Sequence, residues 1–313
     1  MKKFLKHIGI FTILLIVPCI GFEIMLRHIP NSFRFKRELI ETEGHRMKNI
    51  IIGSSVAIHG INPNYLPDST YNLAFRGEWF RYNYKLLETY IDKMPELQNI
   101  IWGICYQALW EDNNEARNET NIIYHNIYTG IHPDKDNIFY QSELLSTGSV
   151  SFRKWSKYYL SRKSTMPCDQ SGFDHGADID TTNNPSKWLN DLPMRLKEHT
   201  GLSQNDIHHE ILEKNIRQMD SIAKLCNERN IKLHIVVCPA YLTYHEQANK
   251  AQLDIIEATI QGLQDRWKDI SYYNYFKDGR FGINDFSDCN HLSSNIGATK
   301  FSKILQQDLH LKK

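Results

Sequence analysis

The chain has 313 residues, of which 41% are hydrophobic and 23% charged, so it is long enough for a large globular domain and too apolar for a disordered or fibrous protein. Its 37 Lys and Arg residues nearly balance its 36 Asp and Glu residues, which makes nucleic acid a poor partner. Six cysteines occur without a C-x-x-C pair, which excludes a zinc ribbon or a thioredoxin motif. The pairing of any disulfide among them cannot be read from the sequence.

Residues 1–30 form a predicted cytoplasmic tip and membrane anchor. The apolar segment 8–25 follows three lysines and approaches the roughly 20 residues that a helix needs to cross a bilayer. The lysines favour a cytoplasmic N-terminus, with the remaining chain on the periplasmic or extracellular side, although basic residues beyond the segment weaken this bias. Because no small-residue cleavage site is present, we expect an uncleaved, single-pass anchor in the inner or plasma membrane. The alternative is a buried hydrophobic helix.

Beyond the anchor, residues 31–313 are predicted to form one α/β domain. Five short runs rich in β-branched and aromatic residues are predicted strands: 49–53, 70–75, 99–105, 231–239 and 269–276. Helical patterns occupy 78–94, 205–230, 245–268 and 295–309. Alternating strands and helices are typical of a three-layer, doubly wound sandwich with a five-stranded parallel sheet, because each parallel pair needs a crossover.

The stretch from about 111 to 200 interrupts this alternation after the third strand. It is polar and irregular, with one predicted helix around residues 151–163, and it is rich in tyrosine and tryptophan. A connection of this length inside a compact domain is usually functional or disordered. Its aromatic residues favour a folded insertion or lid. The alternative is a lid that only completes the fold, with Trp155 and Trp188 in a small core of its own.

Two serines, Ser54 and Ser55, follow the glycine that ends the first strand. Ligands of open α/β sheets bind at the carboxyl ends of the strands, so these hydroxyls are predicted to lie at the ligand edge. A serine there can instead cap a helix, and it becomes a nucleophile only beside a base.

A candidate base lies near the end of the chain, where Asp288 and His291 stand three residues apart before the last helix. This spacing lets the carboxylate orient the imidazole while the other ring nitrogen faces a serine. Alternatively, Asp288 is a helix cap or a calcium ligand and His291 an ordinary packed histidine. Cys289 beside them points to a metal, but no further Cys or His stands at ligand spacing, so no metal and no cofactor are predicted. His59 is expected to pack away from the serine.

These residues resemble the SGNH, or GDSL-like, hydrolase superfamily. Its first block is a Gly-x-Ser after the first strand, which matches Gly53 and Ser55, and its last block is an Asp-x-x-His, which matches Asp288 and His291. Its second block matches residues 72–77, so the backbone N–H of Gly77 is implied as an oxyanion donor. The resemblance implies a flavodoxin-like fold and a catalytic triad of Ser55, His291 and Asp288.

The third block of that family, Gly-x-Asn-Asp, is replaced here by "WGICYQ". Gln107 can supply the missing amide N–H, or it is an ordinary surface amide. The departure makes the chain similar to the membrane-anchored branch that includes the D-alanyl transfer protein of teichoic acids and the periplasmic proteins of polysaccharide O-acetylation.

The resemblance implies a serine esterase or O-acyltransferase that uses an acyl-enzyme, with the oxyanion held by the N–H groups of Ser55 and Gly77 and by Gln107. Its expected substrates are acylated small molecules or envelope glycan esters, and its expected partner is a membrane-bound acyltransferase. We expect the insertion at about 111–200 to select the acceptor rather than to perform the chemistry. The alternative is a non-catalytic accessory protein that keeps the fold and binds glycan or a membrane enzyme. The triad favours the enzyme, and the missing third block favours the accessory protein.

Overall fold

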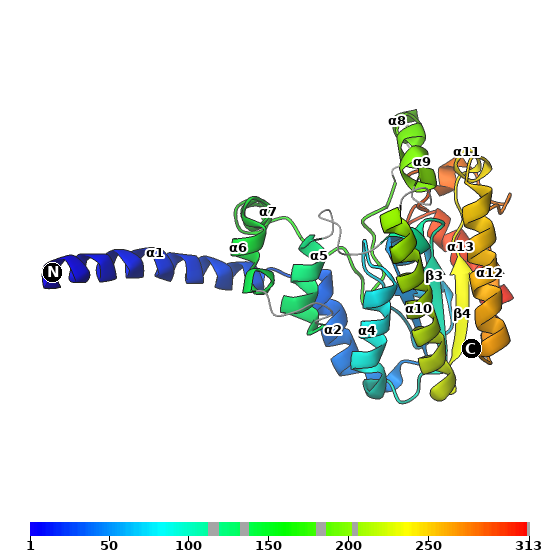
Figure 1. The fold of residues 1–313 in the computed structure, drawn as a ribbon, viewed down its shortest axis with the longest axis horizontal. Helices are drawn as coiled ribbons and strands as arrows, with labels where there is room; N and C mark the ends of the chain where they lie inside the picture. The colour runs from blue at the N-terminus through cyan, green and yellow to red at the C-terminus, as the bar shows by residue number, and fades with distance from the viewer. Residues whose placement is uncertain (112–118, 132–137, 180–185, 202–205, 312–313) are drawn as a thin grey trace.

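A computed structural model of the chain describes residues 1–111, 119–131, 138–179, 186–201 and 206–311 (Figure 1). Its centre is one parallel sheet in the order β2-β1-β3-β4-β5. The strands are β1 (Asn49–Gly53), β2 (Thr70–Asn72), β3 (Asn99–Ile104), β4 (Lys232–Val237) and β5 (Ile270–Asn274). The predicted five-stranded, doubly wound α/β fold is therefore confirmed.

The interior strands form because β-branched residues fill both faces of their pleats. Ile50, Ile51 and Ile52 of β1 are fully buried, as are Ile100 and Ile101 of β3. The second strand is shorter than the predicted segment 70–75, yet the chain beyond it still follows β1. The N–H of Leu73, for example, donates to the carbonyl of Ile51 at 2.8 Å.

Helices cover both faces of the sheet. On one face, α10 (Asp206–Glu228) packs against α4 (Phe80–Tyr90) and α12 (Lys250–Arg266). On the other, α3 (Ser55–Gly60) packs against α13 (Gly297–Asp308). The predicted helix 245–268 is in fact two, because α11 (Leu242–Glu246) ends before Asn249, whose side chain caps α12.

Shorter helical segments connect these elements within the domain. They are α2 (Ser32–Glu43), η1 (Gly44–Arg46), η2 (Pro63–Tyr65), η3 (Ile91–Lys93), η4 (Ala108–Trp110) and η10 (Ile283–Asp285). Since the strand order reverses between β1 and β3, the carboxyl ends of these two strands mark the edge at which ligands bind in such sheets.

The N-terminal helix α1 (Lys2–His28) extends away from the domain (Figure 1). Its most apolar window of 18 residues has a mean hydropathy of 2.3, and no residue of that window is buried. In the described part of the chain, α1 is the one helix that is long and apolar enough to cross a membrane.

The helices of the insertion form two groups that lie in different places (Figure 1). The first, beside α1 and α2, comprises α5 (Glu119–Tyr124), η6 (His125–Thr129), η7 (Ile138–Gln141), α6 (Glu143–Ser146), α7 (Gly148–Trp155) and η8 (Ser156–Leu160). The second lies near α11 and comprises α8 (Ser186–Leu189) and α9 (Leu192–Gly201). Several stretches of the predicted segment 111–200 fall outside the described residues. The helix predicted around 151–163 corresponds to α7 and η8.

Candidate active site

The turn that follows β1 depends on Gly53. Its φ of +130° lies in a region that side chains rarely adopt, and a Cβ there would lie 2.1 Å from the carbonyl oxygen of Gly103 on β3. Gly103 in turn lets α3 approach the sheet, because a Cβ on it would lie 2.7 Å from the Cβ of Ala57. These two close approaches determine where Ser55, the first residue of α3, lies at the carboxyl edge of the sheet.

The two adjacent serines have different surroundings. Ser54 precedes α3 in the N-cap position, but its side chain makes no capping hydrogen bond. It is buried, and its hydroxyl acts to lower the pKa of the neighbouring Cys105 thiol, which burial raises. Ser55 is half-buried, and its Oγ lies 2.7 Å from Nε2 of His291. Of the two hydroxyls, only that of Ser55 is paired with an imidazole.

Asp288 and His291 form a tight turn between η10 and α13. One carboxylate oxygen of Asp288 accepts the backbone N–H of Asn290 at 3.0 Å and that of His291 at 2.9 Å. Nδ1 of His291 lies 2.9 and 3.0 Å from the two carboxylate oxygens. Because an ionised carboxylate only accepts hydrogen bonds, Nδ1 carries the ring proton and Nε2 is left to accept the proton of Ser55.

The charge of Asp288 is stabilised by its neighbours. Burial acts to raise its pKa, but the charge and hydrogen bond of His291, the guanidinium of Arg195 and the N–H of Asn290 together lower the pKa below its usual value. Arg195 comes from α9, and its Nη2 lies 3.8 Å from the carboxylate. The orienting carboxylate is therefore ionised at neutral pH.

A buried asparagine fixes the orientation of α3. The side chain of Asn72 at the end of β2 donates to the carbonyl oxygens of Ala57 and Ile61, each at 3.0 Å, and accepts the N–H of Ala74 at 3.1 Å. It is fully buried, so these bonds do not compete with water. Asn72 thus links the end of the nucleophile-bearing helix to the neighbouring strand.

The two predicted oxyanion residues lie in the segments that follow β2 and β3. Gly77 has a φ of +60° and is half-buried. Gln107 is buried directly before η4, and its side-chain oxygen has no hydrogen-bond partner among the described residues. Their role toward an oxyanion remains a prediction.

The remaining candidates of the sequence take other positions. Cys289 is buried, and all six cysteines are free thiols. In the described ranges, no group of three or more His, Cys, Asp and Glu side chains has the arrangement of a metal site. His59 is buried at the far end of α3, where its Nδ1 lies 3.1 Å from the carbonyl oxygen of Asp174.

The second part of the insertion reaches the turn that carries Asp288 and His291. The ring of Trp188 on α8 meets that of Tyr241 edge-on, with centroids 5.2 Å apart. The N–H of Tyr241 donates to the carbonyl of Cys289 at 2.9 Å. Arg195 and Trp188 thus extend the site, and no motif in the sequence indicated Arg195, because only the fold brings α9 to this edge.

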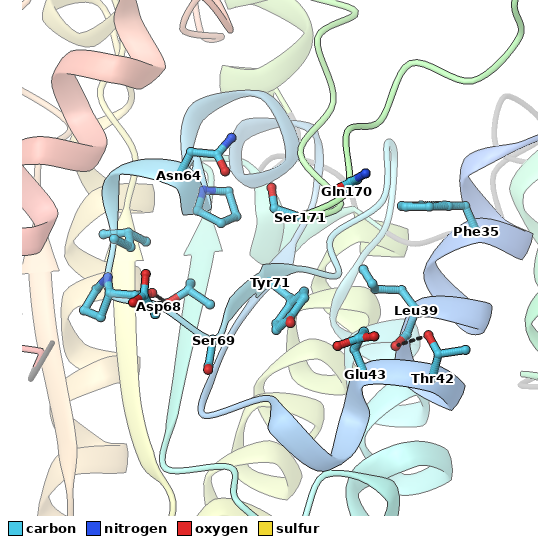
Figure 2. Close-up of a pocket in the computed structure, with 14 residues that line it drawn as sticks. Phe35, Leu39, Thr42, Glu43, Asn64, Asp68, Ser69, Tyr71, Gln170 and Ser171 are labelled. Carbon is cyan, nitrogen blue, oxygen red and sulfur yellow. Dashed lines mark hydrogen bonds between the residues drawn. The ribbon is translucent and has the colours of Figure 1, made fainter.

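A separate cavity of about 610 Å³ lies beside the edge strand β2 (Figure 2). Leu39 and Glu43 of α2, Asp68, Tyr71 and Ser171 are among the residues that line it. None of Ser55, Asp288 and His291 lines this cavity, so it is distinct from the candidate active site.

No protein-family model matches the chain, and no curated protein matches its sequence. A search of solved structures finds a candidate platelet activating factor from Streptococcus pneumonia with 11% sequence identity and a TM-score of 0.42. That match covers 96% of this chain and 99% of the other.

Proposed function

We propose that the chain is a membrane-anchored serine esterase or O-acyltransferase of the SGNH type that acts through an acyl-enzyme. The observation that carries the proposal is the hydrogen-bonded series in which Ser55 contacts Nε2 of His291 and Asp288 contacts Nδ1. Nucleophile, base and orienting carboxylate are thereby each within hydrogen-bond distance of the next, as acyl transfer requires.

The proposed reaction begins with attack of Ser55 Oγ on an ester carbonyl. His291 takes the hydroxyl proton at Nε2, and the resulting imidazolium is stabilised by Asp288. The N–H groups of Ser55 and Gly77, with the amide of Gln107, hold the oxyanion. When the tetrahedral intermediate collapses, His291 returns the proton to the leaving alcohol, and an acyl group remains on Ser55.

The acceptor decides between an esterase and a transferase. Water or a sugar hydroxyl attacks the acyl-serine, and His291 removes the proton from that acceptor. Anchoring by α1 favours a substrate in the cell envelope, and we place the catalytic domain on the periplasmic or extracellular side, with envelope glycan as acceptor and a membrane-bound acyltransferase as partner. We expect Trp188 to contact the glycan acceptor, because sugar faces stack on aromatic rings.

The experiment is fluorophosphonate labelling of the full chain in detergent, together with turnover of a small activated ester. Ser55→Ala should abolish both, because no other described hydroxyl contacts Nε2 of His291. Ser54→Ala is the matched control and should keep much of both activities. A chain that is never labelled would be the non-catalytic accessory protein instead, and the reverse result for the two serines would move the nucleophile to Ser54.

A second experiment separates acylation from transfer. Trp188→Ala should lower transfer to a glycan acceptor about ten-fold, the order of one lost aromatic stacking contact, while labelling of Ser55 stays within a few-fold. Product analysis by mass spectrometry measures the transfer. Equal loss of both activities in folded protein would mean that the insertion builds the catalytic site itself.

A further inference from the structure

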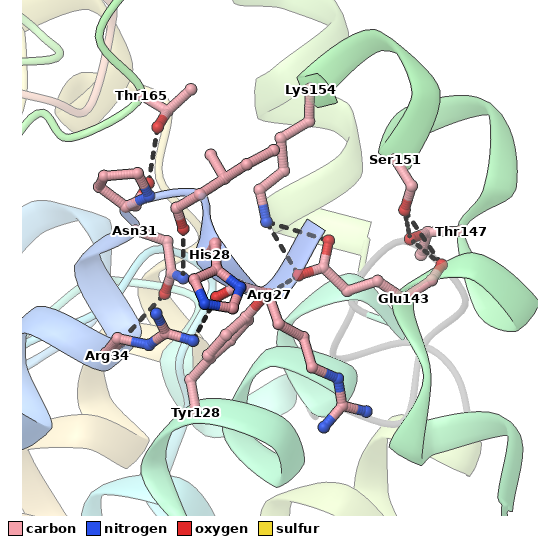
Figure 3. Close-up of polar contacts among 12 residues, drawn as sticks. Arg27, His28, Asn31, Arg34, Tyr128, Glu143, Thr147, Ser151, Lys154 and Thr165 are labelled. Carbon is pink, nitrogen blue, oxygen red and sulfur yellow. Dashed lines mark hydrogen bonds and ion pairs between the residues drawn. The ribbon is translucent and has the colours of Figure 1, made fainter. Parts of the chain in front are cut away.

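A second cavity lies where the membrane anchor joins the domain. It has a volume of about 380 Å³ and is lined by the chain that directly follows α1, by α5 and by α7. Figure 3 shows three of its lining residues, Asn31, Lys154 and Thr165, around the end of α1. None of the residues of the proposed triad lines it.

The cavity carries excess positive charge. Four of its lining residues are basic, and one is acidic, Asp174. The basic residues are Arg76, Arg153, Lys154 and Lys157. Lys154 is neutralised by Glu143, whose two carboxylate oxygens lie 2.9 and 3.0 Å from its Nζ.

The other three bases differ in their pairing. Arg76 lies 3.3 Å from Asp174, but its side chain is 53% exposed. Arg153 and Lys157 are exposed, one helical turn apart, and have no ion-pair partner in the part of the chain that the structure describes. The charge that remains at the mouth of the cavity is therefore that of Arg153 and Lys157.

The surroundings of these two bases are apolar. Phe33, Ile58 and Val150 line the cavity itself. Next to it, Phe152 and Leu160 are 59% and 65% exposed, and Leu145 and Val150 of the same segment are exposed as well. Exposed apolar residues that gather in one segment, unlike single ones, indicate a surface that faces a membrane or a partner. A cationic patch beside exposed aromatic and aliphatic residues is typical of segments that lie in a membrane interface.

The same segment is fastened to the anchor. The carboxylate of Glu23 accepts the hydroxyl of Ser142 at 2.9 Å and the N–H of Leu144 at 3.0 Å. The hydroxyl of Tyr159 donates to the carbonyl of Met25 at 3.1 Å. The ring of Trp155 lies 5.7 Å from that of Phe22. These contacts hold α6, α7 and η8 against the last turns of α1.

The length of α1 indicates at which level of a membrane the cavity would lie. Its 27 residues span about 40 Å at 1.5 Å per residue, whereas the hydrocarbon core of a bilayer needs roughly 20 residues. Where α1 crosses a bilayer, its last turns, which bear Glu23 and Arg27, lie in the headgroup layer, with the cavity beside them.

We propose that this cavity binds the phosphate headgroup of an anionic phospholipid. Arg153 and Lys157 contact the phosphate, and the acyl chains lie along Phe152, Leu160 and α1. Charge complementarity and continuity with the apolar surface of α1 identify the ligand as a lipid of the surrounding membrane. This inference does not depend on the proposed enzymatic function.

The experiment uses the full chain in detergent and a photoreactive phosphatidylglycerol. Wild-type protein should be crosslinked on α7 or η8, and unlabelled phosphatidylglycerol should compete. Phosphatidylcholine and excess inorganic phosphate should compete at least about ten-fold less well, because the first has no net charge and the second has no acyl chain. Equal competition by phosphatidylcholine would overturn the proposal, and so would full competition by inorganic phosphate, which would identify a free-phosphate site.

Two variants test the named side chains. Arg153→Gln with Lys157→Gln should lower crosslinking about 30-fold, the effect expected from two lost charges at about 1 kcal/mol each near a lipid headgroup. Arg217→Gln with Lys224→Gln, which removes two exposed charges from α10, is the matched control and should leave crosslinking unchanged. Val150→Trp keeps every charge but fills the cavity, so it should also reduce crosslinking. Normal crosslinking in both the Arg153/Lys157 and the Val150 variants would contradict the proposal.

Discussion

Two groupings of serine, histidine and aspartate connect α3 to the segment 288–294, and they differ in how the histidine is used. At the first turn of α3, the hydroxyl of Ser55 contacts Nε2 of His291, whereas the carboxylate of Asp288 contacts Nδ1. At the last turn, the main-chain oxygen of Asp174 and the hydroxyl of Ser294 both face Nδ1 of His59, at 3.1 and 3.5 Å. Only the first arrangement can pass a proton from the serine through the ring.

The two groupings also differ in burial. The side chains of His291 and Asp288 are 16% and 25% exposed, whereas those of His59 and Asp174 are 6% and 2% exposed. Burial, together with the charge of Arg76, lowers the pKa of His59 to about 4, so this imidazole is neutral at pH 7. In addition, Ser294 donates its hydroxyl to the carbonyl of Asp174 at 2.9 Å. The grouping of His59, Asp174 and Ser294, the inner grouping, therefore stabilises the fold. Residue types alone thus do not define a catalytic triad.

The largest expected effect separates the two histidines directly. His291→Gln should lower ester turnover and the rate of fluorophosphonate labelling by about 10³-fold or more, because the general base is lost. His59→Gln should leave both rates within a few-fold, since its ring has no contact with Ser55 in the structure. If His59→Gln reduced turnover as strongly in folded protein, the two groupings would act as one site.

The next effect concerns the stability of the inner grouping in acid. Because the pKa of His59 is about 4 in the folded chain and about 6.5 in the unfolded chain, the unfolded state binds more protons between these values. Stability should therefore fall as pH is lowered from 6.5 to 4, by about 3 kcal/mol from this residue. Urea unfolding of the full chain in detergent measures the loss.

Matched variants isolate that contribution. His59→Gln should lose less stability than the wild-type chain over this pH range, whereas His310→Gln, at an exposed position, should follow the wild type. The remaining buried histidines titrate in all three proteins, so they cancel from the difference. Parallel curves for the wild type and His59→Gln would show that His59 is protonated equally in both states.

The smallest expected effect concerns the grouping of Ser55, His291 and Asp288, whose carboxylate lies near Arg195 of α9. Arg195→Gln should lower kcat/KM about two- to five-fold, because a partly exposed guanidinium 3.8 Å from Asp288 contributes little. Arg195→Lys should restore part of the rate, and Lys197→Gln, on the same helix, is the control. High salt should diminish the difference between the wild type and Arg195→Gln. A salt-independent loss would argue for a direct contact of Arg195 with the substrate.

The sequence alone determined the sheet and the apolar N-terminal helix. Runs such as residues 49–53 and 99–105 are typical of buried strands, and the helical crossovers between them favour a parallel order. The same reasoning predicted that Ser55 and the Asp288–His291 turn lie at one edge of the sheet, because the carboxyl ends of parallel strands share an edge. These inferences succeeded because they rest on local patterns and on a topology with few alternatives.

Only the tertiary structure decided how the insertion is used. Nothing in the sequence indicates that Trp155 packs on Phe22 of the anchor while Trp188 packs on Tyr241. The alternative of one small core containing both rings is therefore wrong. The sequence also does not distinguish the environments of His59 and His291. Side-chain contacts between distant segments depend on where each crossover places its helix and on how deeply it is buried, and neither is encoded in local periodicity.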